Sequence, residues 1–115
     1  MNNLHRLFID INRDFSLENR FYEAVKVLAT ETGTLNKRLF AAYYNFLYPI
    51  HSENFQEKDL KTKLEYIEKI FSNPKKCTHY KTSAGGYLHC HWKESAQMAK
   101  NIFYIYETII YSKRK

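Results

Sequence analysis

The sequence has few of the residues that break regular structure or cross-link a chain. Its 115 residues include three glycines, two prolines and two cysteines. So few glycines and prolines argue against the many tight turns of a β-sandwich. Two cysteines are too few for the disulfide scaffold of a small secreted domain. The longest apolar run, residues 39–44, is far shorter than the roughly 20 residues of a membrane span.

These absences favour a helical protein folded around a core of its own. The chain is 44% hydrophobic and 17% aromatic, which excludes a disordered composition. Its length is typical of one domain, so we predict a single helical domain over residues 1–115. The first residues lack the apolar core of a secretory signal. We therefore expect a cytoplasmic protein whose two cysteines remain thiols.

Apolar residues recur at the i, i+3, i+4, i+7 spacing of helices through most of the chain. This spacing predicts four to five helices, near residues 4–12, 17–31, 34–48, 54–73 and from 95 onward. Gly33 suits the end of the second helix, and Thr34 suits the cap of the third. Pro49 stops the third helix, and Pro74 stops the fourth. The sequence thus predicts an all-α class, a compact bundle whose last helix is central.

One long loop, about residues 74–92, separates the last two predicted helices. It contains both cysteines, three of the five histidines, the only tryptophan and two of the three glycines. Loops of this length inside small domains are usually functional, disordered or stiffened by a bound group. We therefore look for function there first.

A zinc site is one hypothesis for this loop. If its two arms are extended and joined through residues 84–86, one thiolate and three imidazoles can meet, from Cys77, His79, His89 and His91. Zinc accepts these ligands, and it could stabilise a loop that buries little apolar surface. The alternatives are a loop without any cofactor, whose histidines are satisfied by hydrogen bonds, and a bridge between Cys77 and Cys90.

A second hypothesis is ribonuclease activity through general acid and base catalysis. Imidazoles with a nearby ammonium can move protons and hold a phosphate, and the candidates are His79, Lys81, His89 and His91. The chain has no P-loop, no Gly-x-Ser-x-Gly elbow, no dinucleotide-binding glycine pattern and no His-Glu-x-x-His motif. Enzymatic activity is therefore the lesser alternative, and we predict a protein that is not an enzyme.

The charge distribution gives the main functional prediction. Residues 1–74 contain ten basic and ten acidic residues, whereas residues 75–115 contain eight basic and two acidic ones. The whole surplus of +6 therefore lies in the last third of the chain. Aromatic residues are interleaved with these cations. The candidate binding residues are Lys75, Lys76, Tyr80, Lys81, Tyr87, Trp92, Lys93, Lys100, Tyr104, Tyr111, Arg114 and Lys115.

Lysines that hold phosphates and rings that stack on unpaired bases suit RNA or single-stranded DNA. We therefore predict a non-enzymatic, nucleic-acid-binding regulator. The alternative is an inhibitor or immunity-type protein that covers an acidic surface of a protein partner, since tyrosine and tryptophan also anchor protein interfaces. Ten tyrosines also leave scope for a homo-oligomer. The structural alternative is that Tyr104 and Tyr111 are half-buried at the edge of the core.

Overall fold

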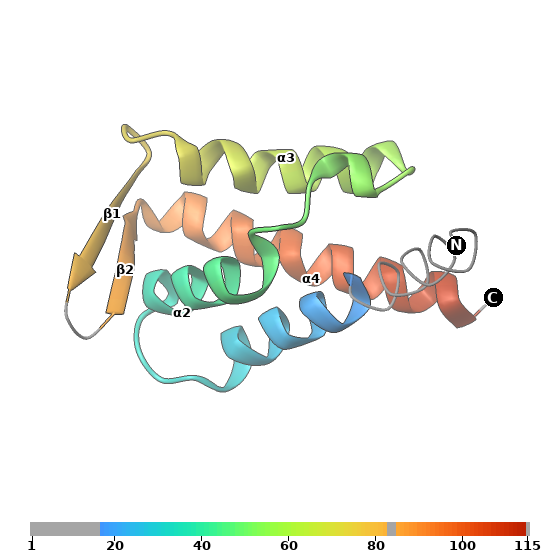
Figure 1. Ribbon diagram of the computed structural model, residues 1–115, viewed down its shortest axis with the longest axis horizontal. Helices are drawn as coiled ribbons and strands as arrows, with labels where there is room; N and C mark the ends of the chain where they lie inside the picture. The colour runs from blue at the N-terminus through green and yellow to red at the C-terminus, as the bar shows by residue number, and fades with distance from the viewer. Residues whose placement is uncertain (1–16, 83–84, 115) are drawn as a thin grey trace, which may run out of the picture.

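The computed structural model describes residues 17–82 and 85–114 (Figure 1). The predicted helix at 4–12 and Lys115 lie outside these residues. The described elements are a helix over 17–30, α2 (Leu35–Ala42), the π-helix η1 (Tyr43–Leu47), the 3-10 helix η2 (Ser52–Asn54), α3 (Lys58–Ser72), β1 (Cys77–Thr82), β2 (Gly85–Cys90) and α4 (Trp92–Arg114).

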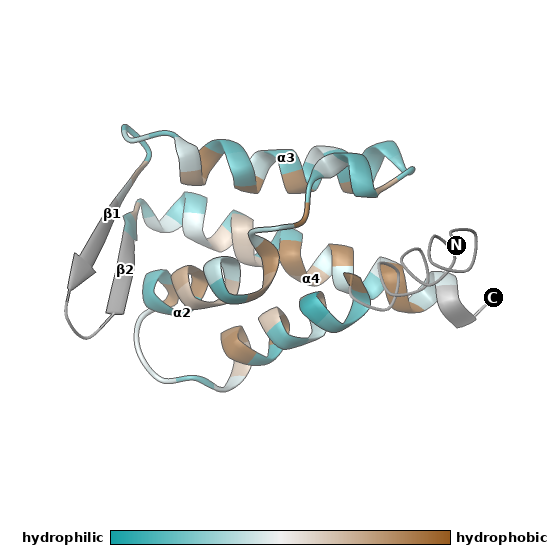
Figure 2. Cartoon of the chain, in the orientation of Figure 1, coloured by the Kyte–Doolittle hydropathy of each residue, from teal (hydrophilic) through white to brown (hydrophobic). Residues whose placement is uncertain are grey.

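The all-α prediction is confirmed, and α4 is the central helix. Figure 1 shows α4 between α3 on one side and α2 with the helix over 17–30 on the other. The apolar side of α3 is turned toward α4 (Figure 2). The largest fully buried side chains come from all four of these helices and from η1: Phe21, Leu39, Leu47, Leu64, Ile67, Met98, Ile102 and Ile105. Burial of this shared set is the main force that holds the helices together.

The predicted helix ends around residue 33 are confirmed. Gly33 has a φ of 104°, a left-handed conformation that costs a glycine little. The hydroxyl of Thr34 accepts a hydrogen bond from the backbone N–H of Lys37 at 3.2 Å, which caps α2. The guanidinium of Arg38 donates to the carbonyl oxygens of Leu28 and Gly33, so it satisfies backbone acceptors at the end of the preceding helix.

The start of α3 differs from the prediction. The sequence predicts a helix from about residue 54, whereas α3 begins at Lys58 after the single turn η2. Phe55 interrupts the helical conformation with φ −108° and ψ 143°. This extended residue places its ring in the core, 6.2 Å from the ring of Phe21. Burial of the Phe55 ring therefore accounts for the later start.

The predicted loop at 74–92 is mostly a β-hairpin. Strands β1 and β2 pair antiparallel, with Cys77 opposite Cys90 and Thr78 opposite His89. An isolated two-stranded hairpin is marginal in water. Here β2 lies against α2 and the base of β1 lies against α3, so the helical bundle supports the pair.

In the part of the chain that the structure describes, none of the helices has the combination of length and apolarity that a membrane span requires.

Candidate nucleic-acid interface

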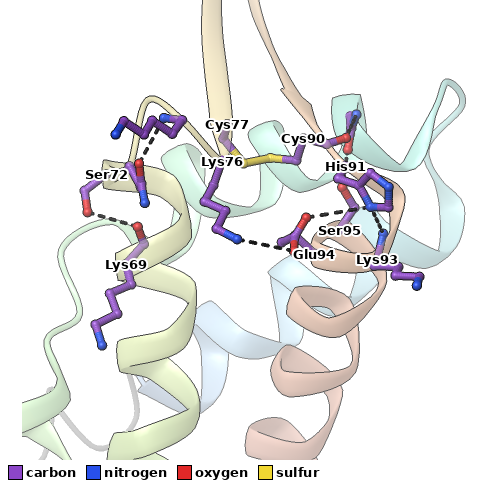
Figure 3. The surroundings of a disulfide bond; sticks show 12 residues. Lys69, Ser72, Lys76, Cys77, Cys90, His91, Lys93, Glu94 and Ser95 are labelled. Carbon is purple, nitrogen blue, oxygen red and sulfur yellow. Dashed lines mark hydrogen bonds and ion pairs between the residues drawn. A yellow bond between two sulfur atoms is a disulfide. The ribbon is translucent and has the colours of Figure 1, made fainter.

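A disulfide between Cys77 and Cys90 closes the base of the hairpin (Figure 3). The two Cα atoms lie 4.4 Å apart, and both residues are buried, with 2% and 4% exposure. The expectation of two free thiols is therefore wrong, because the antiparallel register places the two sulfur atoms side by side. Disulfides persist in oxidising compartments. The disulfide therefore does not support the predicted cytoplasmic location, which stays a prediction.

The zinc prediction needs correction for the same reason. The sulfur of Cys77 is bonded to Cys90, so it supplies no thiolate. His79 pairs in register with Leu88, and His89 pairs with Thr78, so these two histidines are not cross-strand partners. No group of three potential ligand side chains lies together within residues 17–82 and 85–114 as far as their side chains are described. The side chain of His79 lies outside that description.

His91 has a structural role at the start of α4. Its Nδ1 accepts a hydrogen bond from the backbone N–H of Lys93 at 3.1 Å, and its carbonyl accepts from the N–H of Ser95 at 3.0 Å. Both bonds are typical of a residue that caps a helix N-terminus. The cap starts α4 immediately after the hairpin and so fixes the positions from which the side chains of Trp92 and Lys93 project.

Trp92 lies on the surface beside its two chain neighbours. Its side chain is 68% exposed. The ring of His91 stacks on it with centroids 5.8 Å apart, and the ammonium of Lys93 lies 5.7 Å from its centroid. A flat ring flanked by a cation is suited to stack on an unpaired base while the cation meets a phosphate.

Two further lysines approach this end of the molecule from the turn after α3. Asn73 organises that turn. Its side-chain oxygen accepts a hydrogen bond from the N–H of Lys75, and its carbonyl oxygen accepts one from the N–H of Lys76, each at 2.9 Å. The ammonium of Lys76 then lies 4.0 Å from the carboxylate of Glu94 on α4 (Figure 3). Both lysines are exposed. The predicted cations at 75, 76 and 93 therefore gather around the base of the hairpin.

One side of α4 forms a continuous exposed line. Spacings of alternately four and three residues place its members on one helical face. We call this set the outer ridge, and it consists of Lys93, Gln97, Lys100, Tyr104, Glu107 and Tyr111, all exposed. The opposite side of the helix is buried through Ser95, Met98, Ile102 and Ile105.

The tyrosines of the outer ridge are not buried at the edge of the core. Tyr111 is 69% exposed and Tyr104 is 40% exposed. The hydroxyl of Tyr104 donates to Asp59 on α3, and the ammonium of Lys63 lies 4.6 Å from the Tyr104 ring centroid. The hydrogen bond to Asp59 raises the pKa of Tyr104, so this ring stays neutral. It is thus oriented by α3 but still open to solvent.

The predicted binding residues form an elongated surface and not a compact patch. Tyr111 follows Trp92 by nineteen residues, or about 28 Å along the helix axis. Three predicted residues, Tyr80, Lys81 and Tyr87, lie on the hairpin strands, and Arg114 ends α4. The side chains of these four residues are outside the description.

Sequence periodicity misplaces one aromatic residue. The spacing of apolar residues over 95–110 predicts Phe103 on the buried side of α4, but it is 41% exposed. Phe103 therefore lies at the edge of that buried side. Tyr22, on the helix over 17–30, is also exposed at 45%, and its ring lies 6.2 Å from the ring of Tyr106. The spacing of Phe103 from Lys100 and Glu107 is the sequence signal that could have revealed its exposure.

Among the described side chains, no two of the residues proposed for ribonuclease catalysis are shown in contact with each other. His91 uses its Nδ1 to cap α4, and His89 is exposed at the end of β2.

No protein-family model, curated protein or solved structure matches this chain, so the arguments for its function come from its own residues.

Proposed function

We propose that this protein is a non-enzymatic binding protein that holds RNA or single-stranded DNA along the outer ridge of α4. The observation that carries the proposal is that exposed cations and rings share one side of this helix. On the outer ridge Lys93 and Lys100 come first and Tyr104 and Tyr111 follow, while Trp92 lies beside its start.

The chemistry of a single strand fits this combination. Every base has a flat face that stacks on an aromatic side chain whatever its sequence, and every linkage carries a negative charge. Exposed rings therefore offer stacking positions, and the lysines on the same side of the helix offer phosphate contacts. A paired duplex hides its base faces, so the exposed rings favour an unpaired strand.

The position of the basic surplus supports the same reading. Lys75 and Lys76 widen the positive surface at the start of α4, where Trp92 is exposed. Two carboxylates lie within this surface. Glu94 is 3.8 to 4.0 Å from His91 and Lys76, and Glu107 is exposed on the ridge. The net charge of residues 75–115 remains positive by six.

A protein partner with an acidic surface is the second candidate. Phe103 favours it, because an exposed phenylalanine has no polar atom of its own and commonly anchors a protein interface. A pull-down whose captured partner survives nuclease treatment would favour this candidate over a nucleic acid.

The test uses fluorescence anisotropy of a labelled single-stranded oligonucleotide of about ten nucleotides. We expect the double variant Lys93→Gln/Lys100→Gln to bind about tenfold more weakly than the unsubstituted protein at low salt. The matched control is Lys37→Gln/Lys58→Gln, which removes the same charge from exposed lysines outside α4. Equal weakening in both variants would remove the ridge from the proposal. An unsubstituted protein that does not bind would overturn the function itself.

A further inference from the structure

A polar groove runs between α3 and the first half of α4. Its volume is about 500 Å³, within the range of about 300 to 1,000 Å³ for sites that hold small molecules. Three residues of α3 and four residues of α4 line it: Thr62, Lys63, Tyr66, Lys93, Glu94, Gln97 and Asn101. Two of these, Lys93 and Gln97, also belong to the outer ridge. A strand that follows the ridge would therefore pass the mouth of this groove.

The floor of the groove is fixed by a buried amide. Asn101 is only 4% exposed. Its side-chain nitrogen donates to the carbonyl oxygen of Lys63 at 3.1 Å, and its side-chain oxygen accepts from Nε2 of Gln97 at 2.8 Å. These bonds tie α3 to α4 and hold the Gln97 amide in one orientation. The groove is thus preorganised, which lowers the entropy cost of binding.

Glu94 provides the strongest acceptor in the groove. Its two carboxylate oxygens lie 3.8 Å from Nδ1 of His91 and 4.0 Å from Nζ of Lys76 (Figure 3). Both distances exceed the hydrogen-bonding range, so the oxygens keep lone pairs for the donors of a ligand. The side chain is 22% exposed, which leaves it accessible from the groove.

A cation and a neutral phenol lie near this carboxylate. The cation is the ammonium of Lys76, at 4.0 Å. The ammonium groups of the lining residues Lys63 and Lys93 lie against the rings of Tyr104 and Trp92 instead. Burial, and then the nearby Glu94 carboxylate, raises the pKa of Tyr66. Tyr66 therefore stays protonated at neutral pH and presents an uncharged ring. The groove consequently offers a carboxylate acceptor with one lysine beside it and an aromatic ring near it.

Guanine matches this set better than the other bases do. Its N1–H and its 2-amino group are adjacent donors, which a carboxylate can accept with both oxygens. Its O6 and N7 are acceptors for lysine. Uracil presents one N–H between two carbonyl acceptors and has no amino group. A carboxylate beside a lysine therefore favours guanine and opposes uracil.

We infer that the groove between α3 and α4 receives one unstacked base of the strand on the outer ridge, and that it selects guanine through Glu94. This inference rests on the proposed function. Stacking on the ridge is independent of sequence, whereas the groove adds a preference at one position. The preference is expected to be about tenfold, as is usual for one well-formed bidentate contact.

The experiment compares three RNA probes of about ten nucleotides. One contains only uracil, one has a single central guanine, and one has inosine in place of that guanine, which removes the 2-amino group. We expect the guanine probe to bind about tenfold more tightly than the uracil probe, with inosine between them. Glu94→Gln should bind the uracil probe at least as tightly as before, because it removes a negative charge from the binding surface, and it should lose most of the guanine preference. Glu65→Gln is the control, since it changes an exposed carboxylate of α3 outside the groove.

A second variant guards against a fold defect in Glu94→Gln. Thr62 is exposed on the rim of the groove, so Thr62→Trp fills it without disturbing the core. This variant should also lose the guanine preference while keeping its affinity for the uracil probe. Equal binding of all three probes by the unsubstituted protein overturns the groove inference and leaves the proposed function intact. A preference that survives in both variants also overturns it. Binding to none of the probes overturns both proposals.

Discussion

Tyr43 illustrates how its surroundings set the chemistry of one side chain. The residue is 7% exposed, and its ring stacks on Phe71 with centroids 4.2 Å apart and planes at 18°. Burial, and then the carboxylate of Glu68, raises the pKa of Tyr43 to about 12. The phenolate form is thus disfavoured in the folded protein, because it would lose hydration and face a negative charge.

This pKa gives an expected stability profile in alkali. The folded pKa of about 12 exceeds the unfolded value of about 10. The contribution of Tyr43 to the free energy of unfolding is therefore fully present below about pH 10 and is lost as the pH rises from about 10 to 12. At pH 11 the free energy of unfolding of the unsubstituted protein should be lower than at pH 8 by roughly 1 kcal/mol through Tyr43 alone. Tyr43→Phe lacks this decrease.

The measurement is urea unfolding of both proteins at about pH 8 and about pH 11. Other tyrosines ionise in both proteins, so only the difference between them reports on Tyr43. A difference that does not change with pH would contradict the raised pKa.

At the scale of elements, the hairpin base is the structural connection between the helices and the candidate interface. Asn36 of α2 donates to the carbonyl oxygen of Cys90 at 3.2 Å and accepts from the hydroxyl of Ser95 on α4. The disulfide lies beside this bridge, and His91 then caps α4. The position of Trp92 at the start of α4 is consequently fixed by three constraints together: the disulfide, the hydrogen bonds of Asn36 and the cap by His91.

We expect the disulfide to contribute substantially to stability. Cys77 and Cys90 are separated by 13 positions, and closing a loop of this size restricts the unfolded chain by about 3 kcal/mol. Urea unfolding with and without a reductant should show a loss of this order. The double variant Cys77→Ser/Cys90→Ser is the control and should not respond to the reductant. An unchanged midpoint in the reduced protein would show that the bond contributes little.

At the scale of the whole molecule, the positive charges form a surface because α4 is long and central. Lys75 and Lys76 reach its beginning from the turn after α3, while Lys93 and Lys100 lie on the outer ridge. The described cations of the last third of the chain therefore lie at the start of α4 and along its first half, with Trp92 exposed beside them.

Salt should weaken the proposed binding steeply. Four phosphate contacts on a single strand would give a slope of about −3 for log K against log salt concentration. In Lys93→Gln/Lys100→Gln the slope should be less steep by roughly 1.4, because two contacts are removed. Anisotropy titrations at several salt concentrations measure both slopes. Affinity that hardly changes with salt would point instead to a protein interface anchored by the aromatic residues.

The sequence predicted the helices and most of their exposed faces. Apolar spacing identified the buried side of α4, so the exposure of Tyr104 and Tyr111 followed from the same period. Periodicity does not predict the edge of the buried side of α4 as well as its centre, because burial of a residue such as Phe103 depends on a neighbouring helix. Local rules worked at Gly33 and Thr34, where one residue determines the backbone or the cap.

By itself, the sequence determined the all-α class, the helix ends near residues 33 and 73, and the accumulation of positive charge after residue 74. Only the tertiary structure decided that residues 77–90 form a hairpin, that the two cysteines are bonded and that a groove lies between α3 and the first half of α4. Helical periodicity and capping act within a few residues of the chain. Strand register, disulfide pairing and grooves depend on segments brought together from distant positions, which no local pattern specifies.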